Sequence, residues 1–239
     1  MPEGTPKMMQ QTVADTFAKL WTLDKEVFAI AWLSLRVSIS AVALGSAIGI
    51  PAGALLAITT FPGRNGLTAV LNALMGLPAV VVGLVVYLLL SRSGPLGTLG
   101  LLFTPTAMIF AQTILVTPLI AALTRQMIED ADRELGEQLR SMRLSVGQRA
   151  RTLVVDARFS LVVAVLAAFG RAVSEVGAVL VVGGNIDGHT RTMTTAISLE
   201  TQKGDLPLAL SLGLVLMALV IVVNALASLL RSYAMRTYG

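Results

Sequence analysis

Long apolar stretches separated by short polar segments dominate the chain. Five of these stretches come close to the roughly 20 residues that a helix needs to cross a bilayer. They cover residues 37–58, 67–90, 107–123, 159–182 and 206–230. The pattern predicts an all-α integral membrane protein with about five transmembrane helices, which form one membrane domain over residues 37–230.

Three prolines lie inside the predicted spans. Pro51, Pro78 and Pro118 fall within the first, second and third span, respectively. Neighbouring helices in a membrane can satisfy the carbonyl groups that a proline leaves unpaired. We therefore expect these prolines to kink their helices.

The chain ahead of the first span is amphipathic. Its apolar residues recur at helical spacing among polar ones, at Val13, Phe17, Leu20 and Trp21. This spacing predicts a helix that lies on the membrane surface. Trp32 and Arg36 are residue types typical of the headgroup boundary. We assign residues 1–36 to an N-terminal interfacial amphipathic helix; a further span within residues 12–36 is the alternative.

Composition supports a bilayer setting. Of the 239 residues 55% are hydrophobic and only 13% are charged, whereas a soluble domain carries about 25% charged residues. The chain has no cysteine and one histidine, His189, which excludes a disulfide framework and a metal centre built on thiolates or several imidazoles. We expect no metal, no cofactor and no catalytic residues. The basic residues are not interleaved with aromatics in one block, so we expect no nucleic-acid partner.

Arginine placement predicts the orientation. Seven arginines lie between residues 125 and 158, and Arg231 and Arg236 follow the last span. Because Lys and Arg gather in cytoplasmic loops, both segments are predicted to face the cytoplasm, with residues 231–239 as a cytoplasmic tail. With five spans, the N-terminus then lies outside, together with residues 91–106 and 183–205.

The connection 125–158 is long, and long connections are usually functional. Apolar residues interrupt its charges at spacings typical of two short amphipathic helices, at Ile128, Leu135, Leu139, Met142 and Leu144. Two interpretations stay open from the periodicity. The connection is either a solvated hairpin anchored on the membrane surface or a docking element for a cytosolic partner.

Residues 137–145 (EQLRSMRLS) and 153–156 (LVVD) resemble the EAA motif of ABC importer permeases. The glutamate is retained at Glu137, and Arg143 stands where the motif has glycine. Leu153, Val155 and Asp156 replace isoleucine, leucine and proline. The resemblance implies that this segment couples to an ATPase through Glu137, Gln138, Leu139, Arg140, Arg143, Leu144 and Ser145.

Further blocks resemble the signature of tungstate importer permeases, which are close relatives of the molybdate and sulfate permeases. These blocks are LPAVVVGL at 77–84, SRSGPLG at 91–97, FGRAVSEVGA at 169–178, VGGNI at 182–186 and TRTMTTAI at 190–197. They occur in the family's order over about residues 33–225. The resemblance implies a type I ABC importer permease in the cell (inner, cytoplasmic) membrane that imports a tetrahedral oxyanion.

The same resemblance implies the partners. Such permeases form a homodimer, receive substrate from an extracytoplasmic oxyanion-binding protein, and are driven by two copies of a cytosolic ABC ATPase. The chain contains no Gly-Lys pair followed by Ser or Thr, and so has no P-loop. We therefore expect a transport subunit that is not an enzyme. Tungstate is the first substrate candidate, and molybdate or sulfate is the alternative.

Arg171 and Glu175 are charged residues near the middle of the fourth predicted span. A charged side chain there costs about 2.5 to 3.5 kcal/mol on insertion scales. Their i, i+4 spacing puts both on one helix face, where they can pair. Either the pair serves packing alone, or Arg171, Ser174 and Glu175 line the translocation pathway. Gly177 is expected to serve packing, and Gly183 and Gly184 a turn.

The outer segment 183–205 supplies the last candidates. The resemblance implies an outer gate or a contact with the binding protein at Asn185, Thr190, Arg191 and Thr192. We expect residues 190–200 to form a short helix that presents hydroxyl groups, with helix capping by the threonines as the alternative. His189 is expected to be a solvated loop residue.

Two other classes fit part of the pattern. An ion-coupled secondary transporter is compatible with the residues, although such proteins often contain internal repeats and none is found here. A membrane scaffold that transports nothing would not need Arg171 and Glu175. Dependence of uptake on an ATPase separates the first class from an ABC importer.

Overall fold

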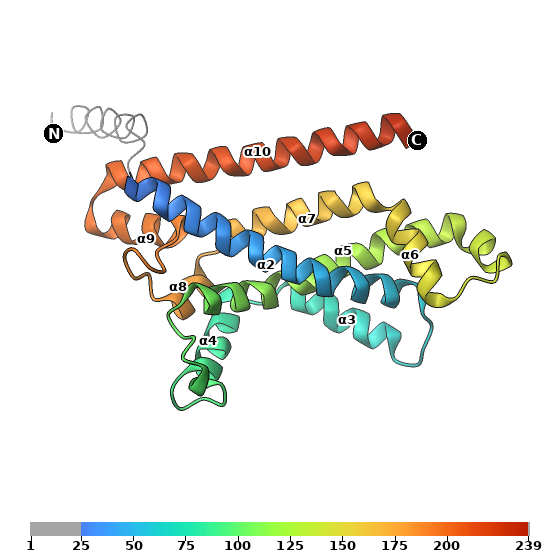
Figure 1. Ribbon diagram of the computed structural model, residues 1–239, viewed down its shortest axis with the longest axis horizontal. Coiled ribbons are helices and arrows are strands. Elements are labelled where there is room, and N and C mark those ends of the chain that lie inside the picture. Colours follow the sequence, from blue (N-terminus) through green and yellow to red (C-terminus); the bar gives the residue numbers. More distant parts are fainter. Residues whose placement is uncertain (1–24, 239) are drawn as a thin grey trace, which may run out of the picture.

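The computed structural model describes residues 25–238, and this range is helical without a strand (Figure 1). The helices are α2 (Lys25–Ile58), α3 (Arg64–Met75), α4 (Ala79–Leu90), α5 (Pro105–Ser141), α6 (Val146–Asp156), α7 (Arg158–Val173), α8 (Gly177–Gly183), α9 (Met193–Lys203) and α10 (Leu206–Tyr238), with a 3₁₀ turn η1 (Gly97–Leu99). The predicted all-α membrane fold is confirmed. The surface helix expected before residue 25, and the alternative span there, lie outside the described residues.

The long helices place the predicted cytoplasmic segments together. Helices α2, α5, α7 and α10 follow the long axis of the molecule (Figure 1). The C-terminal ends of α2 and α10 lie at the same end as α6, whereas α8 and α9 lie at the opposite end. The arginine-rich connection and the C-terminal segment therefore share one side, as the distribution of arginine predicts.

Three helices of the described range are long and apolar enough to span a membrane: α2, α5 and the 206–230 part of α10. Two bent pairs raise this number to five, namely α3 with α4 at 97° and α6 with α7 at 75°. Pro78 lies at the first bend as the N-cap of α4, so its predicted kink is confirmed. Pro51 and Pro118 lie inside unbroken helices.

Two predicted boundaries are wrong. Helix α2 is continuous from Lys25 to Ile58, so residues 25–36 are part of the same helix as the first predicted span, because no helix-breaking residue separates them from the apolar stretch. The fourth predicted span, 159–182, is not one helix: α7 ends at Val173 and α8 begins at Gly177.

Helices α2 and α5 pack closely because glycines lie at the crossing. Gly45, Gly49 and Gly53 recur every four residues along α2 and are buried. A Cβ atom at Gly49 would lie 3.0 Å from the backbone oxygen of Thr117, and one at Gly53 would overlap that of Ala121. Small residues at this spacing are typical of close helix pairs in membranes.

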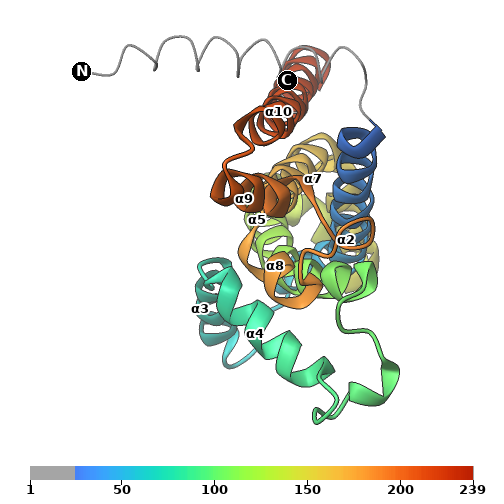
Figure 2. The same ribbon diagram turned by 90° about the vertical axis from the view of Figure 1, so that its left-hand side faces the viewer.

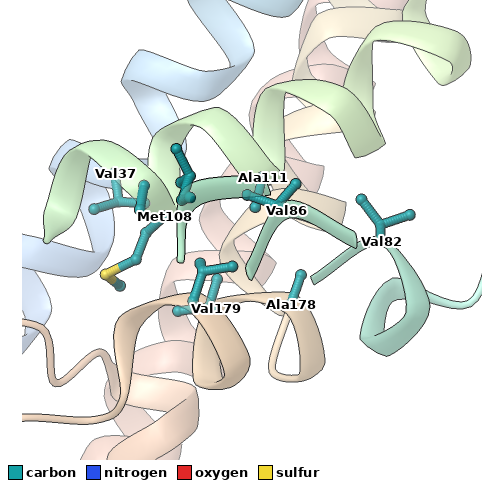
Figure 3. Packing of buried hydrophobic residues seen from close by; sticks show 10 residues of the cluster. Val37, Val82, Val86, Met108, Ala111, Ala178 and Val179 are labelled. Carbon is teal, nitrogen blue, oxygen red and sulfur yellow. The ribbon is translucent and has the colours of Figure 1, made fainter. Parts of the chain in front are cut away.

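A second core joins α4 and α8 to α5. Val82 and Val86 of α4, Val179 of α8 and Met108 of α5 belong to one buried cluster, with Val82 beside Ala178 at its far side (Figure 3). Val37 of α2 completes this cluster. Beyond it, α4 and the loop that follows project away from the helix bundle (Figure 2).

Candidate functional site

The segment that resembles the EAA motif forms a hairpin between α5 and α6. Ser145 and Gln148 form a capping box at the start of α6: Gln148 N donates to Ser145 Oγ at 3.3 Å and Ser145 N donates to Gln148 Oε1 at 2.9 Å. The two short amphipathic helices predicted from the apolar residues Ile128 to Leu144 do not form as separate helices, because α5 runs unbroken to Ser141 and α6 begins only at Val146. No glycine or proline interrupts residues 119–135, so the third span continues into the cytoplasmic segment.

Arg143, which stands where the EAA motif has glycine, adopts a backbone conformation that glycine favours. Its φ of 54° lies in the left-handed region. For a residue with a Cβ atom this conformation costs roughly 1 to 2 kcal/mol. Arg143 therefore forms the turn between α5 and α6 at a cost in stability.

Two contacts fix the hairpin to the membrane helices. Arg149 of α6 binds Asp132 of α5 through Nη2, which lies 2.7 Å from each carboxylate oxygen. These side chains are only 14% and 15% exposed. Leu139 and Leu153 are buried in a cluster that includes Ile58 of α2. Leu139, predicted to contact the ATPase, therefore packs inside the protein because it faces α2 and α6.

The other predicted coupling residues lie on the outside of the hairpin. Leu144 is partly buried, and the rest are exposed: Glu137, Gln138, Arg140, Arg143 and Ser145. An open groove of about 400 Å³ runs along the same surface, lined by Leu144, Gln148, Arg151, Thr152 and Val155. Sequence reasoning missed the α6 part of this surface. The capping box and the helical spacing of residues 144, 148, 151 and 155 were the signals that could have found it.

Arg64 connects the base of the hairpin to α2. It donates from Nε to the backbone oxygen of Leu56 at 2.9 Å and from Nη2 to that of Ala57 at 3.1 Å. It also pairs with Glu129 of α5, which accepts a hydrogen bond of 2.6 Å from Arg125. The last carbonyl groups of α2 are thereby joined to α5 through an arginine.

The predicted ion pair between Arg171 and Glu175 does not form, because the helix ends between the two residues. Glu175 instead accepts hydrogen bonds from Gly177 N at 2.8 Å and Ala178 N at 3.3 Å. Its carboxylate thus caps the first N–H groups of α8. Arg171 is exposed and pairs with no residue between 25 and 238.

Distant residues hold this break in place. Gln112 of α5, which is 3% exposed, donates from Nε2 to the oxygen of Ala172 at 2.9 Å. Thr194 of α9 donates to the oxygen of Glu175 at 2.8 Å. Ser174 donates to the oxygen of Gly170 at 2.9 Å. The polar backbone groups freed by the break are therefore bonded by side chains, as membrane depth requires.

The break between α3 and α4 and the break between α7 and α8 meet at one contact. A Cβ atom at Gly177 would lie 2.5 Å from a methyl carbon of Val80, in the first turn of α4. One turn further, Gly83 lies against Ala178. The packing role predicted for Gly177 is confirmed. Gly184 has a φ of 71° at the end of α8, so the predicted turn is confirmed there, while Gly183 packs on Met108.

In the outer segment, the predicted helix forms as α9, but the threonines at its start are buried. Thr190 and Thr192 are 0% and 4% exposed. Thr190 bonds the oxygen of Gly183 at 2.5 Å, and Thr192 N donates to Thr195 Oγ1 at 3.0 Å at the start of α9. The capping alternative is confirmed, because the hydroxyl groups of Thr192 and Thr195 form a capping box at the start of α9. Asn185 Nδ2 donates to the oxygen of Thr195 at 3.3 Å.

Arg191 is the centre of an ionic cluster at the outer end. Its Nη1 lies 3.2 Å from Asp187, 3.8 Å from Glu26 of α2 and 3.9 Å from Glu200 of α9. Its side chain is 11% exposed. His189, in the same turn, is exposed as predicted. The surface available to an outer partner is formed by residues 186–189 rather than by the threonines.

A multi-span helical protein with an exposed charged hairpin at one end and two broken helices packed together has the architecture of a membrane transport subunit. The chain belongs to the family described as "Binding-protein-dependent transport system inner membrane component", whose sequence pattern matches residues 49–234. It is a multi-pass membrane protein with the type I ABC permease fold.

Related permease proteins agree with this assignment. The chain is 45% identical over 85% of its length to a probable anion ABC transporter permease protein of Haloferax volcanii, of which 90% is covered. It is 42% identical to the tungstate uptake system permease proteins of Peptoclostridium acidaminophilum (86% of this chain, 90% of the relative) and Campylobacter jejuni (65% of each). The predicted family is confirmed. Membership implies an ATPase and a substrate-binding protein as partners of a subunit that is not itself catalytic.

Proposed function

We propose that this chain is the permease of an ATP-driven importer of tungstate, working as a homodimer with two copies of a cytosolic ABC ATPase and an extracytoplasmic oxyanion-binding protein. The observation that carries the mechanism is the continuity of α5. This single helix of 37 residues joins the exposed hairpin to Gln112, which bonds the end of α7. A displacement of the hairpin therefore reaches the helix break through one rigid element.

The ATPase would dock on the outside of the hairpin. The surface combines exposed polar residues of the EAA-like segment with the groove along α6. Met142 and Val146 add apolar side chains that are 63% and 51% exposed. A centre of apolar contacts with a charged rim is typical of protein interfaces. Glu137, Arg140 and Arg143 are suited to the rim because they are exposed.

A movement of the hairpin caused by the ATPase would be transmitted to the membrane helices through two ionic contacts. Arg149 and Asp132 join α6 to α5, and Arg64 and Glu129 join α3 to α5 beside the end of α2. Both contacts are largely shielded from solvent, so the Coulomb attraction is screened less than at an exposed pair. The hairpin and the ends of α2, α3 and α5 would then move together.

The translocation pathway would pass the end of α7. Glu175 is engaged by the backbone of α8, so its charge does not neutralise Arg171 through a direct pair. An exposed guanidinium at membrane depth is costly unless it faces protein or a water-filled passage. Arg171 and Ser174 would therefore face the passage between two copies of the chain. A single arginine gives a transient contact with an oxyanion, which permits release.

Tungstate is preferred as substrate because the uptake permeases at 42% identity bear that name. Molybdate and sulfate share the charge and tetrahedral shape of tungstate, so the permease contacts would distinguish them weakly. The binding protein would make the selection. Asn185 and Arg191 would support the outer surface that receives it, since Arg191 fixes the turn at residues 186–189 to α2 and α9.

The first test is co-purification. The native chain is expected to retain a P-loop ATPase after mild detergent extraction, and Glu137→Arg is expected to lose it. Glu134→Arg is the matched control, since Glu134 is also exposed on α5 but lies outside the EAA-like segment. Recovery of no ATPase with the native chain, together with uptake driven by an ion gradient, would establish the secondary-transporter alternative.

The second test is substrate selection in vesicles that contain the permease, the ATPase and the binding protein. ATP-dependent uptake of tungstate is expected, with competition by molybdate ahead of sulfate. Exclusive uptake of sulfate or molybdate would reject tungstate while leaving the ATP-driven mechanism intact.

A further inference from the structure

An arginine of α2 lies between an outer cavity of mixed charge and an apolar groove. Arg36 is exposed and pairs with no residue between 25 and 238. It lines a cavity of about 460 Å³ together with Leu33 of α2, Pro105 of α5, and Asp187 and His189 of the outer turn. Ile39, one helical turn deeper than Arg36, lines a separate groove of about 380 Å³.

The depth of Arg36 matches the outer headgroups. Helices rise 1.5 Å per residue, so a hydrocarbon layer of about 30 Å takes about 20 residues. Counted back from Ile58 at the cytoplasmic end of α2, this length reaches Ile39. With the inner edge of the hydrocarbon layer set at Ile58, Arg36 would lie at the level of the outer phosphates and the groove would lie among the acyl chains. Trp32, one turn further out and 61% exposed, is the residue type that marks this boundary.

The groove has the chemistry of an acyl-chain site. It is bounded by Ile39 and Ala43 of α2, Phe169 of α7 and Val223 of α10, and all of its lining residues are apolar. It opens to the side of the bundle, because Ile39 is 56% exposed. At this depth the surrounding medium is hydrocarbon, which would fill the groove without desolvating any polar group.

The cavity on the other side of Arg36 holds both signs of charge. The side chain of Asp187 is 71% exposed, and its Oδ1 lies 3.2 Å from Nη1 of Arg191. Two carboxylates, Asp187 and Glu26, line this cavity together with two arginines, Arg36 and Arg191, so a purely anionic headgroup would meet repulsion as well as attraction. A headgroup with a phosphate and an ammonium group matches the two signs, with the phosphate on Arg36 and the ammonium group toward Asp187.

From this arrangement we propose a specific site for one phospholipid of the phosphatidylethanolamine type in the outer leaflet. Its phosphate binds the guanidinium of Arg36, its ammonium group lies near Asp187, and one acyl chain occupies the groove between α2, α7 and α10. The site requires only that the chain resides in a membrane, so it stands independently of the transported anion.

The site can be tested by photolabelling of the full chain in vesicles of equal parts phosphatidylethanolamine and phosphatidylglycerol. A trace of either lipid carries a photoreactive group in its acyl chain, and labelled peptides are mapped by mass spectrometry. We expect the ethanolamine lipid to label the groove more than the exposed face of α10 at Met217 and Ile221. We also expect the glycerol lipid to label the groove less than the ethanolamine lipid does.

Variants separate the parts of the site. Arg36→Gln is expected to lower groove labelling about tenfold, because the loss of one hydrogen bond to a charged group weakens lipid binding by about that factor. Labelling of α10 is expected to stay unchanged. Arg92→Gln, on an exposed arginine of another outer connection, is the matched control and is expected to change nothing. Ala43→Trp is expected to empty the groove while Arg36 is intact, and Asp187→Asn to remove the preference for ethanolamine.

Four outcomes would overturn the proposal. Equal labelling of the groove and the α10 face would indicate only the general lipid layer, and a preference for phosphatidylglycerol would contradict the assigned headgroup. Loss of groove labelling in excess inorganic phosphate would show that Arg36 binds free anions. Disulfide formation between two chains carrying Ala43→Cys would show that a second copy covers the groove.

Discussion

Gln112 of α5 donates a hydrogen bond of 2.9 Å to the backbone oxygen of Ala172, 60 residues away at the end of α7. This bond satisfies one of the carbonyl groups that the end of a helix leaves without an intrahelical partner. It also joins the helix that carries the hairpin directly to the break that carries Arg171 and Glu175.

Gln112→Leu is therefore expected to destabilise the protein by about 1 kcal/mol, because the oxygen of Ala172 keeps only the hydrogen bond from Glu175 N at 3.2 Å. Uptake should fall further than ATP hydrolysis in the assembled transporter. The measurements are thermal unfolding in detergent and the ratio of uptake to hydrolysis. Gln202→Leu, at an exposed glutamine of α9, should leave both unchanged. An unaltered ratio in Gln112→Leu would remove the coupling role.

Arg143→Gly is expected to stabilise the hairpin by about 1 kcal/mol, since glycine adopts a positive φ without the Cβ penalty. Coupling should be retained, because the backbone turn stays the same. Arg140→Gly, three residues earlier inside α5, should instead destabilise by about 1 kcal/mol from lost helix propensity. Denaturant unfolding of the two variants measures the difference, and equal effects would contradict the strained turn.

Asp132→Asn is expected to loosen the hairpin, because it removes the carboxylate to which Nε and Nη2 of Arg149 donate hydrogen bonds. Removal of one partner from a shielded ion pair costs up to about 3 kcal/mol. Hydrogen exchange of residues 146–156 should rise. Asp130→Asn is the control, since Asp130 is 61% exposed and pairs with an exposed arginine. Similar exchange in both variants would argue against a fixed hairpin.

Arg171→Ala is expected to reduce uptake about 10- to 100-fold, the value of one hydrogen bond to a charged group in the passage. Assembly should be unaffected, because Arg171 is exposed and makes no pair within residues 25–238. The readouts are anion uptake and the mass of the detergent-extracted complex. Unchanged uptake would exclude Arg171 from the pathway, and Arg92→Ala should behave like the native chain.

Gly53→Ala is expected to destabilise by about 1 to 3 kcal/mol, because the added methyl group would overlap the backbone oxygen of Ala121. Gly66→Ala in α3 meets open space and should be neutral or stabilising by up to about 1 kcal/mol. Thermal unfolding of both variants tests the α2–α5 crossing. A neutral Gly53→Ala would show that the helices can separate locally.

The apolar stretches, the side that carries the arginines and the order of the family's blocks could all be predicted from the sequence. Each depends on local composition: about 20 apolar residues commit a segment to the bilayer, and arginines resist translocation. The capping glycine at 184 and the packing glycine at 177 were also recognisable, because glycine has few other reasons to occur at such positions.

The tertiary structure alone decided where the polar groups point. Hydropathy predicts one helix over residues 159–182, yet the break after Val173 forms because Gln112 and Thr194 bond the freed backbone oxygens. Glu175 is three residues from the N–H of Ala178 and four from Arg171, so spacing allowed either partner, and the break selected the backbone. The burial of Leu139 and Thr192 likewise depends on α2, α6 and α9 meeting in space. Local sequence determines which segments enter the membrane, whereas contacts between distant residues determine where those segments break and which side chains remain free to act.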